Sequence, residues 1–281
     1  MKTILVVANE TIGGSALFDA VKAKVDAAGG DARVVLCVPR GTPKHGNVIY
    51  DDFVFQAAQV RVDLARQFLR EAGIEAIGEV GDPDPFSATM DAVGEYRPDE
   101  VVVSTFPATS SGWMRRDLID RITESTGLPV EHVVVDLDVE GLPFQVTLVV
   151  ANRTAASPGL LECLTKLDDQ DETPRFFIAL VPQEGGDGLA GRRAQARLAQ
   201  IEDRMRSEDL ISAGLVGDPD PYTAIMNALQ FFRVDDVVVA TLPATRSGWL
   251  RGDLISRVRS ATGKPVQHIE VEVPAGAPAA A

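Results

Sequence analysis

The chain has 281 residues, of which 45% are hydrophobic and 24% charged, a profile typical of a globular protein with one large or two ordinary domains. Its formal net charge of −14 repels phosphate backbones and anionic membrane surfaces, so we expect no nucleic acid and no membrane among its partners. The two cysteines, Cys37 and Cys163, lack metal-type spacing, and no run approaches the roughly 18 apolar residues of a membrane span. We therefore predict a cytoplasmic protein.

The first half of the chain alternates short apolar, β-branched runs with helical patterns. The runs predict five strands, at residues 3–8, 33–38, 75–80, 100–105 and 130–136. The stretches between them predict four helices, at residues 15–28, 51–72, 84–96 and 113–126. Val101, Val102 and Val103 follow one another with no polar residue between them, which is typical of a parallel strand buried on both faces. The alternating order predicts an α/β fold with a doubly wound parallel sheet.

Two signals mark helix ends in this half of the chain. Asp84 precedes Pro85; aspartate caps the free backbone N–H groups of a first helical turn, and proline fits that turn. Gly127 stands where a helix C-terminus needs a left-handed residue. We interpret the segment Gly-Asp-Pro-Asp-Pro at positions 81–85 as a turn followed by a capped helix. A metal held by Asp82 and Asp84 is the weaker alternative, and we predict no metal site.

The chain repeats itself. The segment at 81–85 returns at 217–221, an offset of 217 − 81 = 136. The opening Val-Val-Ala-Asn of residues 6–9 returns at 149–152, an offset of 149 − 6 = 143, so the second copy is seven residues shorter. We expect this difference near residues 41–60. A period near 140 residues is that of a whole domain rather than of a solenoid repeat.

The repeat predicts two tandem domains and a short tail. The boundary falls near Glu140 and Gly141, so the first domain covers residues 1–140 and the second covers residues 141–274. Residues 275–281, at the end of a stretch rich in alanine and proline, are interpreted as a disordered tail.

These features together resemble the universal stress protein superfamily. The resemblance rests on five strands in this order, the opening Ile-Leu-Val-Val-Ala-Asn at 4–9, the Gly-Asp-Pro after the third strand and the valine-rich fourth strand, and it covers nearly all of both copies. It implies two adenine-nucleotide alpha-hydrolase-like sheets of strand order 3-2-1-4-5, with a ligand crevice between strands one and four. It also implies that the copies pair through their fifth strands as an intramolecular pseudo-dimer, with a further homodimer as an option.

The chain departs from the nucleotide-binding members of that family at two places. Those members carry an acid at the end of strand one, where this chain has Asn9 and Asn152. They carry Gly-x2-Gly-x9-Gly-Ser/Thr after strand four, where the final position here aligns with Asp117 and Asp253. An aspartate there would repel a phosphate. The cofactor is therefore left unassigned: ATP or a related nucleotide is one candidate, and another small anionic ligand is the other.

The leading candidate site is the loop that links strand four to the next helix in each copy. Free backbone N–H groups and the positive end of a helix dipole favour an anion there, and nearby hydroxyls and arginines could bind its oxygens. The residues concerned are Thr105, Thr109, Ser111 and Arg115 in the first copy and Thr241, Thr245, Ser247 and Arg251 in the second. In the alternative interpretation the loop only caps its helix, while Trp113 and Trp249 pack between the domains.

The ends of strands one and two complete the predicted crevice. Asn9 and Asn152 could hydrogen-bond a base or a ribose, or could hold their own turns through their side chains. The other predicted lining residues are Thr11, Val38, Thr154 and Val181.

We therefore predict a stress-response protein of the universal stress type that binds a nucleotide or another small anionic ligand between strands one and four, in one or both copies. The alternative is a scaffold or interaction module whose ligand sites have decayed. An enzyme, such as a slow hydrolase of a bound nucleotide, is the weakest hypothesis. No nucleophile motif such as Gly-x-Ser-x-Gly accompanies His132 or His268, so we interpret both histidines as structural and assign no catalytic residue.

Overall fold

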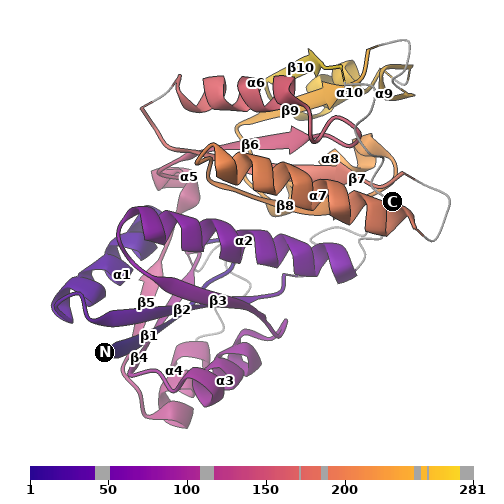
Figure 1. The fold of residues 1–281 in the computed structure, drawn as a ribbon. Coiled ribbons are helices and arrows are strands. Elements are labelled where there is room, and N and C mark those ends of the chain that lie inside the picture. Colours follow the sequence, from indigo (N-terminus) through magenta and orange to yellow (C-terminus); the bar gives the residue numbers. More distant parts are fainter. Residues whose placement is uncertain are drawn as a thin grey trace. The chain divides into compact units, whose positions relative to one another are not determined.

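The computed structural model of the chain describes residues 1–41, 51–107, 117–170, 172–184, 189–243, 248–251 and 253–272 (Figure 1). Contacts within the chain group it into two units, Met1–Asn47 with Ala58–Pro143, and Val48–Ala57 with Phe144–Ala281. The predicted tail lies outside the described residues. Among the helices that are described, none combines the length and apolar character needed to cross a membrane.

The first unit contains one sheet of five parallel strands. The strands are β1 (Lys2–Val7), β2 (Ala32–Pro39), β3 (Ala76–Gly81), β4 (Glu100–Thr105) and β5 (Val130–Val134). Their order is β3-β2-β1-β4-β5, and every neighbouring pair is parallel. The helices of this half of the chain are α1 (Ser15–Ala27), α2 (Asp51–Glu71), α3 (Pro85–Tyr96), α4 (Asp117–Thr126) and the short α5 (Leu137–Glu140). Helix α5 was not predicted from the sequence.

Helices cover both faces of this sheet, with α1 and α2 on one side and α3 and α4 on the other (Figure 1). Successive strand residues point to opposite faces, so Val6 packs with the α1 and α2 side chains while Leu5 and Val7 pack with those of α3 and α4. Full burial of such a side chain stabilises the fold by about 1.5–3 kcal/mol. This two-sided burial explains why the strands are apolar without alternation.

The second unit repeats this arrangement. Its strands are β6 (Gln145–Val150), β7 (Arg175–Pro182), β8 (Ser212–Gly217), β9 (Asp236–Thr241) and β10 (Val266–Glu270), all parallel and in the order β10-β9-β6-β7-β8. The helices are α6 (Pro158–Asp168), α7 (Ala190–Ser207), α8 (Pro221–Phe231), α9 (Gly248–Arg251) and α10 (Leu254–Thr262). The predicted fold class, two doubly wound parallel sheets of order 3-2-1-4-5, is confirmed.

The Gly-Asp-Pro-Asp-Pro segments form capped helix starts in both copies. Oδ2 of Asp84 accepts the backbone N–H of Ser87 at 3.0 Å, and Oδ2 of Asp220 accepts that of Thr223 at 2.9 Å. Helices α3 and α8 then begin at the prolines that follow these aspartates. The interpretation of these segments as a turn and a capped helix is therefore confirmed.

The seven-residue length difference lies between the second and third strands. The last residues of β2 and β7, Pro39 and Pro182, are 143 apart (182 − 39), whereas Gly78 in β3 and Gly214 in β8 are 136 apart (214 − 78). The difference therefore lies between residues 39 and 78, a range that includes the predicted residues 41–60. Both glycines also have the same packing role. A Cβ at Gly78 would lie 2.6 Å from a side-chain atom of Val62, and a Cβ at Gly214 would lie under 3 Å from a side-chain atom of the corresponding helix, so each glycine allows that helix to pack closely on its strand.

Candidate functional site

The strand order reverses between β1 and β4 in the first sheet and between β6 and β9 in the second. In doubly wound sheets, ligands bind at the carboxyl ends of the two strands that flank such a reversal. We call the carboxyl ends of β1 and β4 the first switch point and those of β6 and β9 the second. Asn9 follows β1 and Asn152 follows β6, as predicted, so each lies at a switch point.

A buried arginine is bonded to Asn9 at the first switch point. Nη1 of Arg61, in α2, donates to Oδ1 of Asn9 at 2.8 Å. Arg61 is 7% exposed and Asn9 is 8% exposed. Burial lowers the pKa of Arg61 to about 10, although the nearby carboxylate of Glu10 acts to raise it. The guanidinium therefore stays charged at neutral pH, inside the protein and beside an acid.

The second switch point has the same pair with more partners. Nη1 of Arg197, in α7, donates to Oδ1 of Asn152, and Nδ2 of Asn152 donates to the carbonyl oxygen of Pro182 at 2.7 Å. Nη2 of Arg197 also reaches Oε2 of Glu184 at 3.4 Å, and Glu184 forms a longer ion pair with Arg153 at 3.8 Å. The charged group of Arg197 is thus neutralised from the loop that follows β7.

Neither arginine was predicted from the sequence. Arg61 and Arg197 are separated by 197 − 61 = 136 residues, the offset of the later parts of the two copies, so the repeat itself contained the signal. The presence of arginine at both positions did not reveal its hydrogen bond to the switch-point asparagine, because Asn9 and Arg61 lie 52 residues apart in the chain.

The threonines that follow the asparagines differ between the two copies. Oγ1 of Thr154 donates to the carbonyl oxygen of Ala240, in β9, at 2.9 Å. Thr11 is only 3% exposed, yet its Oγ1 has no hydrogen-bond partner among the described residues. The same holds for Oγ of Ser104, in β4, which is 1% exposed and corresponds to Ala240 at the offset of 136. The first switch point thus contains two buried hydroxyls that the described chain leaves unsatisfied.

The threonines that end β4 and β9 are bonded to the two histidines. Oγ1 of Thr105 lies 2.9 Å from Nε2 of His132, in β5, and Oγ1 of Thr241 lies 2.9 Å from Nε2 of His268, in β10. The hydroxyl of Thr105 also donates to the carbonyl oxygen of Phe106 at 2.9 Å. Because a hydroxyl has one hydrogen to donate, the Nε2–H of His132 is then the donor in the bond between His132 and Thr105. Both histidines thus have a partner at a sheet edge, and the structural role predicted for them stays a prediction.

The N-terminus of α1 is capped from far along the chain. Gly14, its N-cap residue, provides no side chain, and a Cβ there would lie 2.3 Å from Cγ1 of Val135. Oε2 of Glu140, in α5, accepts the backbone N–H of Ala16 at 3.4 Å instead. A carboxylate at the positive end of a helix dipole is stabilising. The carboxylate of Glu140 therefore already occupies the N-terminus of α1.

The N-terminus of α6, which corresponds to α1, is capped locally. Oγ of Ser157 accepts the backbone N–H of Leu160 at 3.3 Å, and Pro158 occupies the first turn. Ser157 aligns with Gly14 at the offset of 143. The same backbone position thus uses a serine in one copy and a distant glutamate in the other.

The remaining predicted residues are core residues or lie outside the described parts. Val38 and Val181 are fully buried in apolar clusters beneath α2 and α7. The other predicted residues, in the loops after β4 and β9, are Thr109, Ser111, Arg115, Thr245 and Ser247, which lie outside the described residues, and Arg251, which belongs to α9 and whose side chain is not described. Ligand contacts for all of these residues stay predictions.

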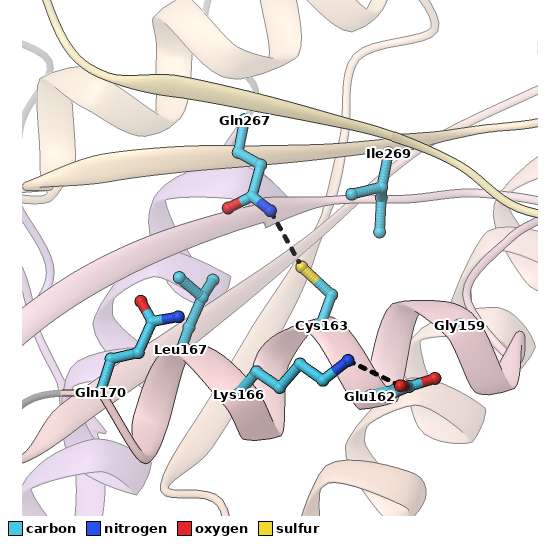
Figure 2. Close-up of a pocket in the computed structure, with 8 residues that line it drawn as sticks. All are labelled: Gly159, Glu162, Cys163, Lys166, Leu167, Gln170, Gln267 and Ile269. Atoms are coloured by element: carbon cyan, nitrogen blue, oxygen red, sulfur yellow. Dashed lines mark hydrogen bonds and ion pairs between the residues drawn. The ribbon is translucent and has the colours of Figure 1, made fainter.

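A separate hollow of about 360 Å³ lies between α6 and β10 (Figure 2). In Figure 2 the amide of Gln267 points to the sulfur of Cys163, at 3.4 Å, and Lys166 pairs with Glu162 along α6. Burial raises the pKa of Cys163, so its thiol is a weak nucleophile at neutral pH. None of the residues that line this hollow was predicted as a site residue.

No metal cluster accompanies these features in the part of the chain that the structure describes: no three His, Cys, Asp or Glu side chains gather there as ligands. Asp82 and Asp84 instead bond to the turn and helix start they precede, Oδ1 of Asp82 accepting the N–H of Asp84 at 2.8 Å.

Comparison with known proteins gave results only among solved structures. No family model matches the chain. No curated protein matches it.

The solved structures that match include a MurG from Acinetobacter baumannii and universal stress proteins. One from Burkholderia pseudomallei is 18% identical, covering 47% of this chain and 94% of its own, with a TM-score of 0.34. A universal stress protein in complex with cAMP is 18% identical, covering 47% of this chain and 96% of its own, with a TM-score of 0.33. A universal stress protein from Archaeoglobus fulgidus DSM 4304 is 16% identical, covering 95% of this chain and 96% of its own, with a TM-score of 0.34. These likenesses concern the fold.

Proposed function

We propose that the chain is a tandem protein of the universal stress type that binds a small ligand, a nucleotide or another anion, where its strand order reverses. The observation that carries the proposal is the arginine–asparagine pair at each switch point, Arg61 with Asn9, which is buried, and Arg197 with Asn152, which is partly buried. Burying the guanidinium of Arg61 is costly, and the repetition of the hydrogen-bonded pair at the place where this fold class binds ligands favours a ligand-related role over chance.

The second candidate function is that of a scaffold or interaction module. The hydrogen bonds at the second switch point favour it. There the side chains of Asn152, Thr154 and Arg197 are bonded to other parts of the chain, to Pro182, Ala240 and Glu184 respectively. A site whose polar groups bond to the protein itself offers less to a ligand. Pairing of the two copies through their edge strands, β5 and β10, stays a prediction under either function.

Native mass spectrometry of freshly purified protein tests ligand binding directly. We expect a nucleotide-sized adduct, or a thermal shift in a panel of ATP, AMP and cAMP, because a ligand that binds only the folded state raises its stability. Replacing Arg115 and Arg251 with alanine, in the predicted loops after β4 and β9, should weaken binding and leave the fold intact. Arg204→Ala, an exposed arginine of α7, is the matched control. The absence of both adduct and shift would favour the scaffold.

A further inference from the structure

The hollow between α6 and β10 lies where the first copy has an ion pair. In the first copy Nζ of Lys24, in α1, pairs with Oε2 of Glu131, in β5, at 2.8 Å and so joins the helix to the strand. Leu167 and Gln267 stand at the corresponding positions of the second copy, at offsets of 167 − 24 = 143 and 267 − 131 = 136. These two side chains carry no charge and cannot form that bridge, and both line the hollow (Figure 2).

The hollow has the size and the mixed lining of a site for a small molecule. Its volume of about 360 Å³ lies at the lower end of the range for ligand pockets, about 300–1,000 Å³. The half-buried side chains of Leu167 and Ile269 give it apolar walls on either side of Cys163 (Figure 2). The amides of Gln170 and Gln267 and the ion pair of Lys166 with Glu162 add polar groups. This lining suits a ligand with a small apolar part and a polar head.

The polar groups around the hollow can change partners at low cost. Nε2 of Gln267 donates to Sγ of Cys163 at 3.4 Å, and because sulfur is a weak acceptor, an oxygen would be a better partner. Nζ of Lys166 donates to Oε1 of Glu162 at 2.7 Å, in a pair whose side chains are 67% and 69% exposed. An exposed ion pair contributes little to stability. The hydrogen bond raises the pKa of Lys166 and lowers that of Glu162, so both groups are charged at neutral pH.

These groups fit a ligand that carries both charges. A carboxylate can accept hydrogen bonds from the ammonium of Lys166 and the amide of Gln267. Such a carboxylate alone would take Lys166 away from Glu162 and would then face the negative charge of Glu162. An ammonium group on the same ligand removes this repulsion, because it replaces Lys166 as the partner of Glu162. The α-amino acid zwitterion has a carboxylate and an ammonium on one carbon, as this arrangement requires.

We propose that the hollow between α6 and β10 binds the zwitterion of a small apolar α-amino acid. Lys166 and Gln267 bind its carboxylate, Glu162 binds its ammonium, and its side chain lies between Leu167 and Ile269. The inference concerns a site apart from the switch points, so it can fail without the function proposed above, and that function can fail without it.

Isothermal titration of the full chain with L-leucine tests the site. We expect saturable binding of one leucine per chain with a dissociation constant on the order of 1 mM, as suits so small a ligand. Two analogues separate the charges: 4-methylpentanoate lacks the ammonium, and 3-methylbutylamine lacks the carboxylate. Each should bind about tenfold more weakly than leucine or not at all, because each leaves one charged side chain of the hollow without its partner.

Replacing Leu167 with lysine and Gln267 with glutamate in one chain installs the ion pair of the first copy without changing the net charge. This double variant should lose leucine binding and keep its melting temperature. Lys166→Ala should weaken leucine binding by about tenfold, the equivalent of one lost charged hydrogen bond. Arg206→Ala is the matched control, because it removes an exposed ion pair of the same kind, with Asp203 in α7, and leucine affinity should stay within about twofold.

Three results would overturn the inference. The first is the absence of saturable leucine binding below about 10 mM. The second is leucine binding that is unchanged in the double variant or in Lys166→Ala, since leucine would then bind elsewhere; if the double variant does not fold, Lys166→Ala decides. The third is 4-methylpentanoate bound as tightly as leucine, since the ammonium would then contribute nothing. None of these results bears on nucleotide binding at the switch points.

Discussion

In the second copy the carboxylate of Glu184 pairs with Arg197 and the hydroxyl of Thr154 bonds to β9, whereas the first copy has Gly41 and Thr11 at the corresponding positions. The backbone topology of the two sheets is the same. Duplication therefore preserved the fold and let the polar groups at the switch point diverge. The difference teaches that the polar groups at a switch point can be bonded within the chain in one copy and not in the other without a change of fold.

The largest expected effect comes from removing the arginines bonded to Asn9 and Asn152. Arg61→Met should lower the free energy of unfolding by about 2–3 kcal/mol, because it leaves the buried Oδ1 of Asn9 without its donor. Arg197→Met should cost less, about 1–2 kcal/mol, since Glu184 is 40% exposed and can be hydrated when its partner is removed. Urea unfolding of both variants measures this. Equal losses would show that the two pairs are buried alike, against the comparison drawn above.

Installing alanine at the two helix N-caps comes next. Gly14→Ala places a methyl group 2.3 Å from Val135 and should destabilise the first unit by about 2 kcal/mol through overpacking. Ser157→Ala loses the bond to the N–H of Leu160 and should cost about 1 kcal/mol. Thermal unfolding of the two variants measures the two losses. If Gly14→Ala were harmless, the glycine would not be required for the packing of α1 against Val135.

The aspartate caps provide the comparison in which no difference is expected. Asp84→Ala removes the hydrogen bonds from the backbone N–H and the hydroxyl of Ser87, and Asp220→Ala removes those from the same groups of Thr223. The corresponding bonds have closely similar lengths in the two copies. Each should cost about 1 kcal/mol. Chemical denaturation of the pair checks this. A clear inequality would mean that the surroundings of α3 and α8 differ more than their caps indicate.

The smallest effect should come from Glu140→Gln. Loss of the carboxylate at the α1 N-terminus should lower stability by about 0.5 kcal/mol, with the loss shrinking as salt is added. Glu75→Gln, at an exposed position before β3, is the control for loss of one negative charge. A salt-independent loss would point to the hydrogen bond to Ala16 rather than to the helix dipole.

The sequence predicted the strands, the main helices and the capped segments correctly, because each depends on neighbours within a few residues or on a period along the chain. The sheet order was predicted from the family resemblance and is also confirmed. The aspartates of the Gly-Asp-Pro-Asp-Pro segments are an example, since Asp84 bonds to Ser87, three residues away. The switch-point residues Asn9 and Thr11 were found for the same reason: they follow an apolar run. The short helix α5 and the cap from Glu140 were missed.

By itself, then, the sequence determined the internal repeat and the alternating strands and helices of two doubly wound sheets, while the place where their strand order reverses was implied by the family resemblance. Only the tertiary structure decided which polar groups are satisfied there. Asn9 meets Arg61 across 52 residues and Ala16 meets Glu140 across 124, and no local pattern marks either pair. The physical reason is that burial is a property of the packed sheet and helices together: a hydroxyl such as that of Thr11 becomes costly only when packing removes its water and the chain provides no other partner.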